Sequence, residues 1–588
     1  MNSINKRTNR LFQLLPFALF FFMGTFYLYY FTSYIFFYQE KSGLFLVSFE
    51  YLFEHLNQPG GFLVYLGELQ TTLYYYPLIG ALIVVAEIVG VIFLIEKIAK
   101  VLVGGVFYFL PFFIGAVLFL LQTNYQYLAF NNLGIIIQLV LFYRVITYSQ
   151  NKYRWIAVGL FPVIYFLFGS FSVIFLWLFS IFLIQKKDWL KLAGTWILAC
   201  LFFFIGREYL FFQTTNTLWQ YPFDIQDIGV QIKLFATVVG IVAILPLLTK
   251  IEMKRISAVL IKKVKLVELN PFLIIIVLAF LVIPRIDKKN SHYFYVEKLF
   301  YEQKYDELVE FNKQFPSSNM LTAFLNNVAL VEIGRLTESF FSFPQSPDGG
   351  TLFLKWEIIS EVLKRGGYFY YSVGMINEAQ RWAYEYMVMQ GNSPEALKMM
   401  IKTDLIKGKN KIAEKYISIL EKSIFYREDA REFRALLYND NAILNHSELS
   451  AKRLLDAKQD FFVQSDNPAI NLNFIIKADS TNLAAIEYKL AWLMLQKDMR
   501  GVVDLLPVME KAGYLRIPKN VEEVVVSYKL LKVGEMPEMK RLQINPRTEQ
   551  RFQRFYRTFQ QHRGNKHQAQ QALAREFSDT YWYYVFFS

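Results

Sequence analysis

The stretch that decides the fold is YYPLIGALIVVAEIVGVIFLI, residues 75–95, in which Glu87 is the one charged side chain. An apolar run of about 20 residues is long enough, as an α-helix, to cross a hydrocarbon layer about 30 Å thick. A carboxylic acid inside such a helix is costly. We therefore expect Glu87 to pack between helices, hydrogen-bonded to Gln138 or Tyr143, or to belong to an ion path. The stretch predicts a membrane-spanning helix.

Similar apolar runs recur through the first 285 residues, at 11–37, 75–95, 101–121, 127–147, 155–168, 171–185, 190–206, 229–249 and 269–285. The fifth and sixth runs are short and are joined by Gly169-Ser170, which predicts a tight hairpin or a re-entrant pair. Composition agrees, because 54% of the 588 residues are hydrophobic and 19% are charged, against about 25% charged in soluble domains. The single cysteine, Cys200, excludes an intramolecular disulfide. We predict an all-α membrane bundle of about nine spans over residues 1–285.

Basic residues indicate how this bundle is oriented. With the N-terminus in the cytoplasm, 17 of the 21 Lys and Arg residues up to Arg285 fall on the cytoplasmic side. Lys and Arg are enriched in cytoplasmic loops, so this arrangement satisfies the positive-inside rule. An odd number of spans then places residues 286–588 outside the cytoplasm. Most of the net charge of +13 lies in the hydrophobic half, so it indicates topology and membrane lipid rather than nucleic acid.

Residues 286–588 read as a separate helical domain. Two segments, starting at Gly374 and Gly408, share the pattern Gly-x4-Ala, ending at Ala379 and Ala413, and their glycines are 34 residues apart. This is the tetratricopeptide period, in which each repeat is a helical hairpin. The sequence predicts a tetratricopeptide-like α-solenoid, with a generic helical domain as the alternative. The aromatic C-terminus, residues 581–587, is expected to pack on this domain or to enter the membrane surface.

The first outer loop, residues 38–74, is the most informative stretch for chemistry. It contains the candidate catalytic acids Glu40, Glu50 and Glu54. Glu50 and Glu54 are four residues apart, so on a helix they share one face. The apolar neighbours on that helix are available to lipid, and a second amphipathic stretch follows after a Pro-Gly-Gly break. The alternative interpretation of each acid is a solvated helix face.

A second group of candidates would bind the substrate. Arg207 and Glu208 follow the seventh run at the leaflet depth of the first outer loop, and Arg pairs phosphate oxygens in a bidentate manner. The group consists of His55, Arg207, Glu208, Trp219, Tyr221 and Asp224. The alternative for Arg207 is an ion pair with Glu208, and amphipathic side chains are also common at membrane boundaries for reasons unrelated to catalysis. His55 is either a packing histidine or an acid–base, and a carboxylate here could also hold a divalent cation.

This loop architecture, with its placement of Glu40, Glu50 and Glu54, resembles the first outer loop of the GT-C superfamily of glycosyltransferases. The resemblance implies an extracytoplasmic site, a polyprenyl-phosphate-linked sugar as donor, and a protein or glycan acceptor; the usual Asp is absent. The run Gln58-Pro-Gly-Gly with Tyr74-Tyr-Tyr-Pro-x-x-Gly80 is similar to that of an uncharacterised family of bacterial inner-membrane proteins. This resemblance implies a location in a bacterial inner membrane, and it does not point to any activity. The first hypothesis is therefore a membrane glycosyltransferase. The second is a non-enzymatic scaffold whose repeats recruit envelope-assembly partners, and the third is an acyl or phospho-group transferase.

Overall fold

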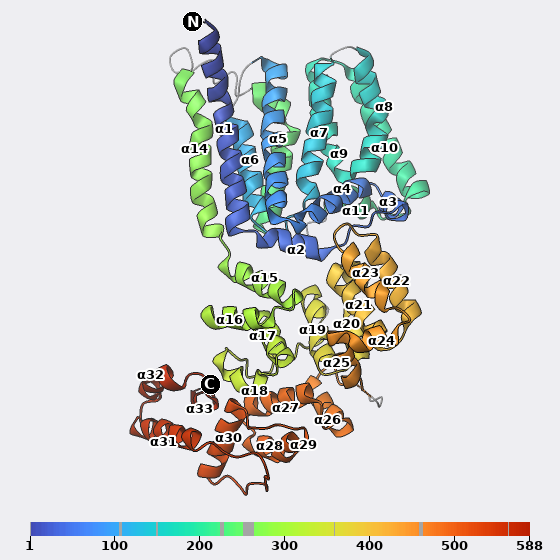
Figure 1. Cartoon of the computed structure of the whole chain (residues 1–588). Helices are drawn as coiled ribbons and strands as arrows, with labels where there is room; N and C mark the ends of the chain where they lie inside the picture. The colour runs from blue at the N-terminus through green and yellow to red at the C-terminus, as the bar shows by residue number, and fades with distance from the viewer. Residues whose placement is uncertain are drawn as a thin grey trace. The chain divides into compact units, whose positions relative to one another are not determined.

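The computed structural model describes the chain over these ranges: 2–104, 109–148, 151–223, 229–250, 264–357, 359–457, 463–562 and 564–587. Every regular element within them is helical and none is a strand, so the predicted all-α class is confirmed for this part of the chain (Figure 1). The chain divides into two compact units. Unit 1 comprises Met1–Lys288 and Lys422–Phe425, and unit 2 comprises Lys289–Glu421 and Tyr426–Ser588.

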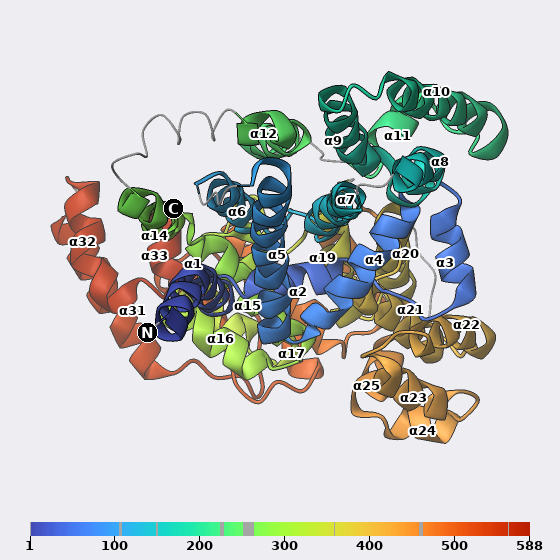
Figure 2. The ribbon, with the colours of Figure 1, turned by 90° about the horizontal axis from the view of Figure 1, so that it is seen from above.

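Unit 1 contains long apolar helices and the short helices that connect them. Its elements are α1 (Asn2–Phe31), α2 (Tyr34–Ser42), α3 (Phe49–Leu56), α4 (Gly61–Thr72), η1 (Leu73–Tyr75), α5 (Pro77–Val103), α6 (Phe109–Gln122), α7 (Phe130–Thr147), α8 (Asn151–Phe168), η2 (Gly169–Phe171), α9 (Ser172–Gln185), α10 (Trp189–Ile205), η3 (Gly206–Leu210), α11 (Thr215–Gln220), α12 (Val230–Ala243), α14 (Val264–Val282) and η4 (Ile283–Arg285). Figure 2 looks along the long helices, where α5 packs against α1, α6 and α7. Aliphatic side chains of α5, such as Ile88 and Ile92, are fully buried there and form the centre of the core.

Within the described residues, five helical stretches are long and apolar enough to cross a membrane, or six if the broken helix pair around Arg285 counts as one span. The five are Leu14–Phe31, Pro77–Val103, Phe130–Thr147, Asn151–Gln185 and Trp189–Leu210. This number is smaller than the nine runs of the sequence, partly because the third and eighth runs form shorter apolar helices, Phe109–Gln122 and Gln231–Ala243. The helices of unit 1 thus have the length and composition of a membrane protein.

The chain reverses direction between α8 and α9. Nη1 of Arg154, near the start of α8, lies 3.7 Å from a carboxylate oxygen of Asp188, which follows α9. One continuous helix would separate these two residues by about 50 Å, at about 1.5 Å per residue. The two short apolar runs joined by Gly169-Ser170 are therefore antiparallel, with η2 as the turn.

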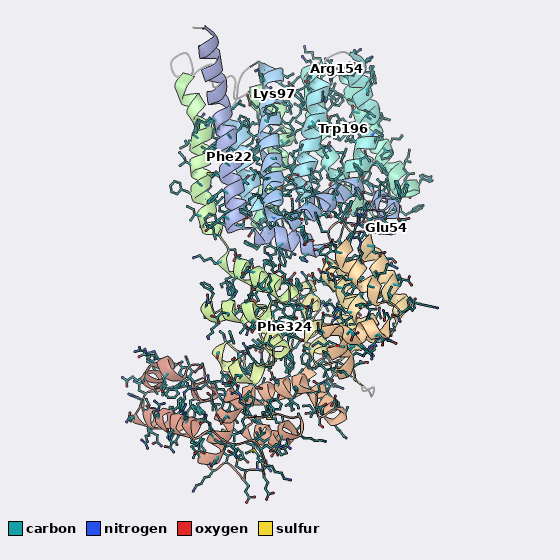
Figure 3. The ribbon with its side chains drawn as sticks, viewed as in Figure 1. Phe22, Glu54, Lys97, Arg154, Trp196 and Phe324 are labelled. Carbon is teal, nitrogen blue, oxygen red and sulfur yellow. The ribbon has the colours of Figure 1, made fainter. Side chains whose placement is uncertain are left out.

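The two ends of the unit 1 bundle differ in chemistry. The short helices α2, α3, α4 and α11 gather at one end, where Glu54 lies, and Lys97 and Arg154 lie toward the other end (Figures 1 and 3). Between the ends, long helices expose large apolar side chains, such as Phe22 on α1, which is 71% exposed. An apolar belt between two polar ends suits helices that are surrounded by lipid.

Unit 2 is built of shorter helices. These are α15 (Lys288–Tyr301), α16 (Tyr305–Gln314), α17 (Met320–Glu332), α18 (Leu336–Ser339), η5 (Phe340–Ser342), α19 (Ser360–Ser372), α20 (Ile376–Gln390), α21 (Pro394–Ile406), α22 (Asn410–Glu421), α23 (Arg427–Leu436), α24 (Asp440–Asn445), α25 (Ser447–Leu455), α26 (Pro468–Ala478), α27 (Leu483–Leu495), α28 (Met499–Asp504), α29 (Leu506–Lys511), α30 (Lys519–Leu530), α31 (Pro546–Gln561), α32 (Lys566–Phe577) and α33 (Tyr581–Phe587). Gly374 separates α19 from α20 and Gly408 separates α21 from α22, both with positive φ. Ala379 and Ala413, five residues after these glycines, are fully buried. The two Gly-x4-Ala segments therefore occupy equivalent places in successive helix pairs.

The aromatic C-terminus packs within unit 2. Trp582 is 1% exposed, and its indole N–H donates to the backbone carbonyl of Glu523 at 2.8 Å. Its ring lies 5.1 Å from that of Phe552 and 5.8 Å from that of Phe555, measured between centroids. Of the two arrangements expected for this segment, packing on the helical domain is the one observed.

Candidate active site in the first loop

Glu40 lies in α2, directly after the first apolar helix, and is 7% exposed. The neighbouring Gln39 fixes this helix, because its Nε2 donates to the carbonyl oxygens of Tyr127, at 2.8 Å, and Tyr125, at 3.1 Å. The ring of Tyr38 packs edge-on against that of Tyr125, with centroids 4.8 Å apart. Helix α2 is thus anchored to the connection between α6 and α7, and Glu40 is held in a fixed, largely dehydrated position.

Glu50 and Glu54 lie on the short helix α3, and both are exposed. Phe49 and Phe53, on the same helix, are 79% and 63% exposed. The helix therefore presents acidic and large apolar side chains to its surroundings together. This combination is typical of a helix that lies in a membrane interface.

His55 connects α3 to α4. Its Nε2 lies 3.1 Å from a carboxylate oxygen of Glu68, and its Nδ1 lies 2.8 Å from the carbonyl oxygen of Tyr51. The Tyr51 hydroxyl donates to the same oxygen of Glu68. The rings of Tyr51 and Tyr65 lie 4.6 and 5.7 Å from the imidazole, centroid to centroid. Three titratable groups thus converge between the two helices of the first loop.

The protonation of His55 follows from these contacts. Both ring nitrogens face oxygen acceptors, and only the imidazolium form can donate from both. Burial lowers the pKa of His55, but the hydrogen bonds to Glu68 and Tyr51 and the charge of Glu68 outweigh it, so the pKa is raised above 6.5. His55 is therefore an ion-pair partner that holds α3 on α4, as well as a possible proton donor.

Three segments that are distant in sequence meet beside the turn between α3 and α4. A Cβ atom on Gly60 would lie 2.8 Å from Cδ of Pro222 and 3.1 Å from Cα of Gly169. Gly60 also has φ of +88°, which favours glycine. The backbone N–H of Ser170 donates to the carbonyl of Tyr221 at 3.1 Å. We call this contact the glycine junction; it places Tyr221, a predicted substrate-binding residue, next to the first loop.

The other predicted substrate-binding residues lie around η3 and α11. Nε of Arg207 is 3.3 Å from a carboxylate oxygen of Glu208, and their side chains are 45% and 59% exposed. Trp219 is 55% exposed and packs on Phe203 at 4.9 Å between ring centroids. Among the described residues, the ion pair of Arg207 is with its neighbour, not with an acid of the first loop. Asp224 lies within 224–228, outside the described residues.

Glu87 belongs to a polar network inside the bundle. It is 8% exposed, and Nδ2 of Asn132 lies 3.5 Å from its carboxylate. The hydroxyl of Tyr127 donates to Oδ1 of Asn132 at 3.1 Å. The partners are thus Asn132 and Gln70, and not the expected Gln138 or Tyr143. Because the carbonyl of Tyr127 also anchors α2, this network links the middle of α5 to the helix that carries Glu40.

The sequence reasoning missed two residues of the His55 cluster as candidates, Tyr51 and Glu68. A signal was present, because Tyr51 and His55 are four residues apart and share a face of α3. Residues of α4 return to that face after the Pro-Gly-Gly break, which is what brings Glu68 into reach. Within the described ranges, no three His, Cys, Asp or Glu side chains are grouped to hold a metal ion.

The fold and the site define a class of protein, an all-helical chain in which membrane-length helices carry an acidic, amphipathic loop at one end, followed by a large helical unit. The chain belongs to the family described as "Family of unknown function (DUF6057)", which matches residues 7–588. No curated protein matches the chain. No solved structure matches it either.

Proposed function

We propose that the protein is a membrane glycosyltransferase that moves a sugar or glycan from a polyprenyl-phosphate carrier to an acceptor outside the cytoplasm. The observation that carries this proposal is the setting of Glu40. It follows the first apolar helix directly, it is 7% exposed, and its helix is anchored through Gln39 to the carbonyls of Tyr125 and Tyr127. A carboxylate held in place with little water around it is suited to act as a general base.

The proposed step is a displacement at the anomeric carbon. Glu40 takes the proton of the acceptor hydroxyl as the oxygen forms its bond to the sugar. The bond between the sugar and the phosphate breaks, and polyprenyl phosphate leaves with the electron pair. Arg207 is exposed enough to exchange its partner Glu208 for the phosphate, because that pair is a surface ion pair of small net energy. Trp219 and Tyr221 supply aromatic faces for the sugar.

The proposal includes a topology. Nine passes, with the N-terminus in the cytoplasm of a bacterial cell and the chain in the inner membrane, would put the first loop and unit 2 outside. The separation of Lys97 and Arg154 from Glu54 supports this orientation (Figure 3), because basic ends face the cytoplasm. Unit 2 would act as a tetratricopeptide-like solenoid that delivers the acceptor. Its equivalent glycine turns at Gly374 and Gly408 support that interpretation.

The test compares acid-to-amide variants in cells. E40Q should lower glycan product by about 10²- to 10⁴-fold, the usual contribution of a general base, and resemble deletion of the gene. E50Q is the matched control, because Glu50 lies exposed on the same loop, and it should retain product. Envelope glycans are measured by mass spectrometry, with protein abundance checked by immunoblot. Normal product in E40Q at normal abundance would remove Glu40 as the base.

One observation favours the second candidate function, a non-enzymatic scaffold. Among the described residues, Arg207 pairs with Glu208 and is not joined to the acids of the first loop, so the predicted donor contact and the predicted base do not form one cluster. If deletion changes the envelope while E40Q, E50Q and E54Q each behave as wild type, the scaffold is the better account. The partners recruited by unit 2 would then be identified by crosslinking in the intact membrane.

A further inference from the structure

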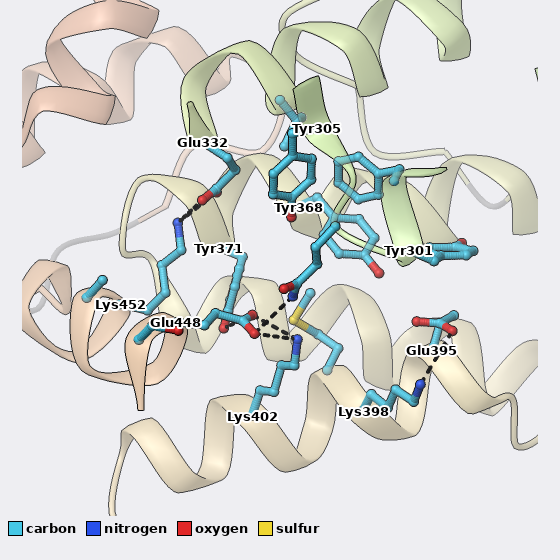
Figure 4. A pocket seen from close by; sticks show the side chains of 16 residues that line it. Tyr301, Tyr305, Glu332, Tyr368, Tyr371, Glu395, Lys398, Lys402, Glu448 and Lys452 are labelled. Atoms are coloured by element: carbon cyan, nitrogen blue, oxygen red, sulfur yellow. Dashed lines mark hydrogen bonds and ion pairs between the residues drawn. The ribbon is translucent and has the colours of Figure 1, made fainter. Parts of the chain in front are cut away.

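Unit 2 encloses a cavity of about 290 Å³, far along the chain from the acids of the first loop. The end of α15 and parts of α16, α17, α19, α21 and α25 surround it (Figure 4). Its volume is at the lower end of the range for small-molecule sites. The cavity is therefore the size of a small ligand rather than of an extended chain.

Tyrosines provide much of the cavity wall. Tyr301, Tyr305, Tyr368 and Tyr371 all line it, with Phe300 among them. The ring of Phe300 holds those of Tyr305 and Tyr368 edge-on, at 5.6 and 4.8 Å between centroids. Tyr371 donates its hydroxyl to Glu448 at 2.8 Å. The hydroxyls of Tyr305 and Tyr368 have no hydrogen-bond partner in the described part of the chain, so they can serve a ligand.

The charged side chains of the cavity neutralise one another. Nζ of Lys452 lies 2.7 and 2.9 Å from the two carboxylate oxygens of Glu332. Nζ of Lys402 lies 2.8 Å from both oxygens of Glu448. Burial raises the pKa of Glu448, but the charge and hydrogen bonds of Lys402, with other hydrogen bonds, hold it at about 2. Glu448 is therefore ionised at neutral pH.

A third pair completes this balance. Nζ of Lys398 lies 4.0 Å from a carboxylate oxygen of Glu395 and 3.1 Å from one of Asp429. The cavity wall thus carries three lysines and three glutamates, each within an ion pair. A charged ligand would have to break one of these pairs to gain a counter-charge. A neutral ligand could accept from the ammonium groups and donate to the carboxylates without disturbing them.

We propose that this cavity binds a neutral saccharide unit. A sugar ring presents a flat face of C–H groups, which packs on an aromatic ring, and a rim of hydroxyls, each both donor and acceptor. The wall supplies both counterparts, because tyrosine rings stand beside lysine donors and glutamate acceptors. A peptide segment is the alternative occupant, because its amide groups can bond the same lysine donors and glutamate acceptors, but it lacks the flat C–H face of a sugar ring. The inference rests on unit 2 alone and holds whether or not the first loop is catalytic.

The test is direct binding to the full chain in lipid nanodiscs, since glycoside detergents would compete. Saturation-transfer NMR is recorded with cellobiose, chitobiose, maltose and mannobiose. Trialanine, which carries no net charge at neutral pH, is the peptide probe. We expect at least one disaccharide to bind saturably at millimolar concentration. The double variant Y305F/Y368F keeps both rings and removes the two available hydroxyls, so it should weaken binding about tenfold. The control Y384F alters an exposed tyrosine outside the cavity and should bind as wild type does.

Three results would overturn the inference. In the first, no disaccharide binds the wild-type chain, and in the second, Y305F/Y368F binds a disaccharide as tightly as wild type does. In the third, trialanine binds, Y305F/Y368F weakens that binding, and the disaccharides do not bind. The last result would reassign the cavity to peptides. The E40Q variant separates this inference from the proposed transferase. It should bind the disaccharide normally even where its glycan product is lost.

Discussion

Replacing Arg365 with methionine should destabilise unit 2 strongly. Arg365 lies on α19 and is fully buried, and its guanidinium is 2.7 Å from carboxylate oxygens of both Glu297 and Glu361. Glu297 is 1% exposed and also contacts Lys364 at 3.0 Å. The guanidinium lies 5.0 Å from the ring centroid of Tyr293. R365M fills a similar volume but leaves a buried carboxylate with one remaining cation.

The magnitude follows from this burial. Removing one partner of a buried ion pair typically costs about 3–5 kcal/mol, and an opposite charge at about 4 Å contributes about 4 kcal/mol at an effective dielectric constant of about 20. Because Lys364 still faces Glu297, we expect the lower part of this range, about 3 kcal/mol. For a unit of this size, that corresponds to a fall in Tm of about 6 °C.

The assay is thermal unfolding of the full chain in nanodiscs, followed by tryptophan fluorescence. Trp382 is a suitable reporter, because it is fully buried and packs directly on Gly366, the residue after Arg365. The control is R335M, which breaks the exposed pair of Arg335 and Asp306 and should cost less than about 1 kcal/mol.

Equal Tm values for R365M and R335M would refute the reasoning, because burial would then not govern the cost of losing the cation.

The remaining predictions concern packing and pH. Gly67→Leu should lower the Tm through overpacking that costs about 1–3 kcal/mol, because a Cβ at Gly67 would lie 2.7 Å from a carbon of α7. The control Gly159→Leu should leave the Tm unchanged, because a Cβ at Gly159 would have nothing within 4 Å. Equal effects of the two variants would contradict this prediction. Burial raises the pKa of Glu487 to about 7, so its stabilising contribution is full below about pH 4.5 and is lost as pH rises through 7. The free energy of unfolding of the wild type, measured in denaturant titrations, should therefore fall by up to about 3 kcal/mol between pH 5 and 8 relative to that of E487Q. Parallel pH profiles of the two proteins would contradict this prediction. E68Q should lower the pKa of His55, so NMR titration of the imidazole should show a lower midpoint than in wild type; an unchanged midpoint would mean that Glu68 does not hold the charge.

Hydropathy indicated much of unit 1, because the signal that defines a span is local. Helix α5 spans Pro77–Val103, around the run at 75–95, and begins at a proline, as helices often do. The helices α3 and α4 likewise lie on the two sides of the Pro-Gly-Gly break, where the first loop was expected to be helical. Helix length was harder to read. Pro77–Val103 extends well beyond its apolar run, while the described part of the third run forms a helix of 14 residues.

The contacts that make the site could not be read in the same way. The α7 residue that meets Glu87 depends on the rotation of α7 against α5, and a turn of one residue replaces Asn132 by a neighbour. The cavity of unit 2 draws its wall from six helices spread between Phe300 and Lys452. No spacing rule relates such positions, since they are joined by packing rather than by period.

The glycine junction constrains how the first loop can move. Gly60 and Gly169 touch backbone to backbone, with Pro222 against both, so no flexible side chain is interposed to absorb a displacement. The loop therefore cannot swing open as an independent flap, because the reversal between α8 and α9 and the segment after α11 would be carried along with it. A bulky group that enters this end of the bundle has to pass beside this fixed backbone contact. Its access is then governed by the neighbouring elements, which no such contact holds in place.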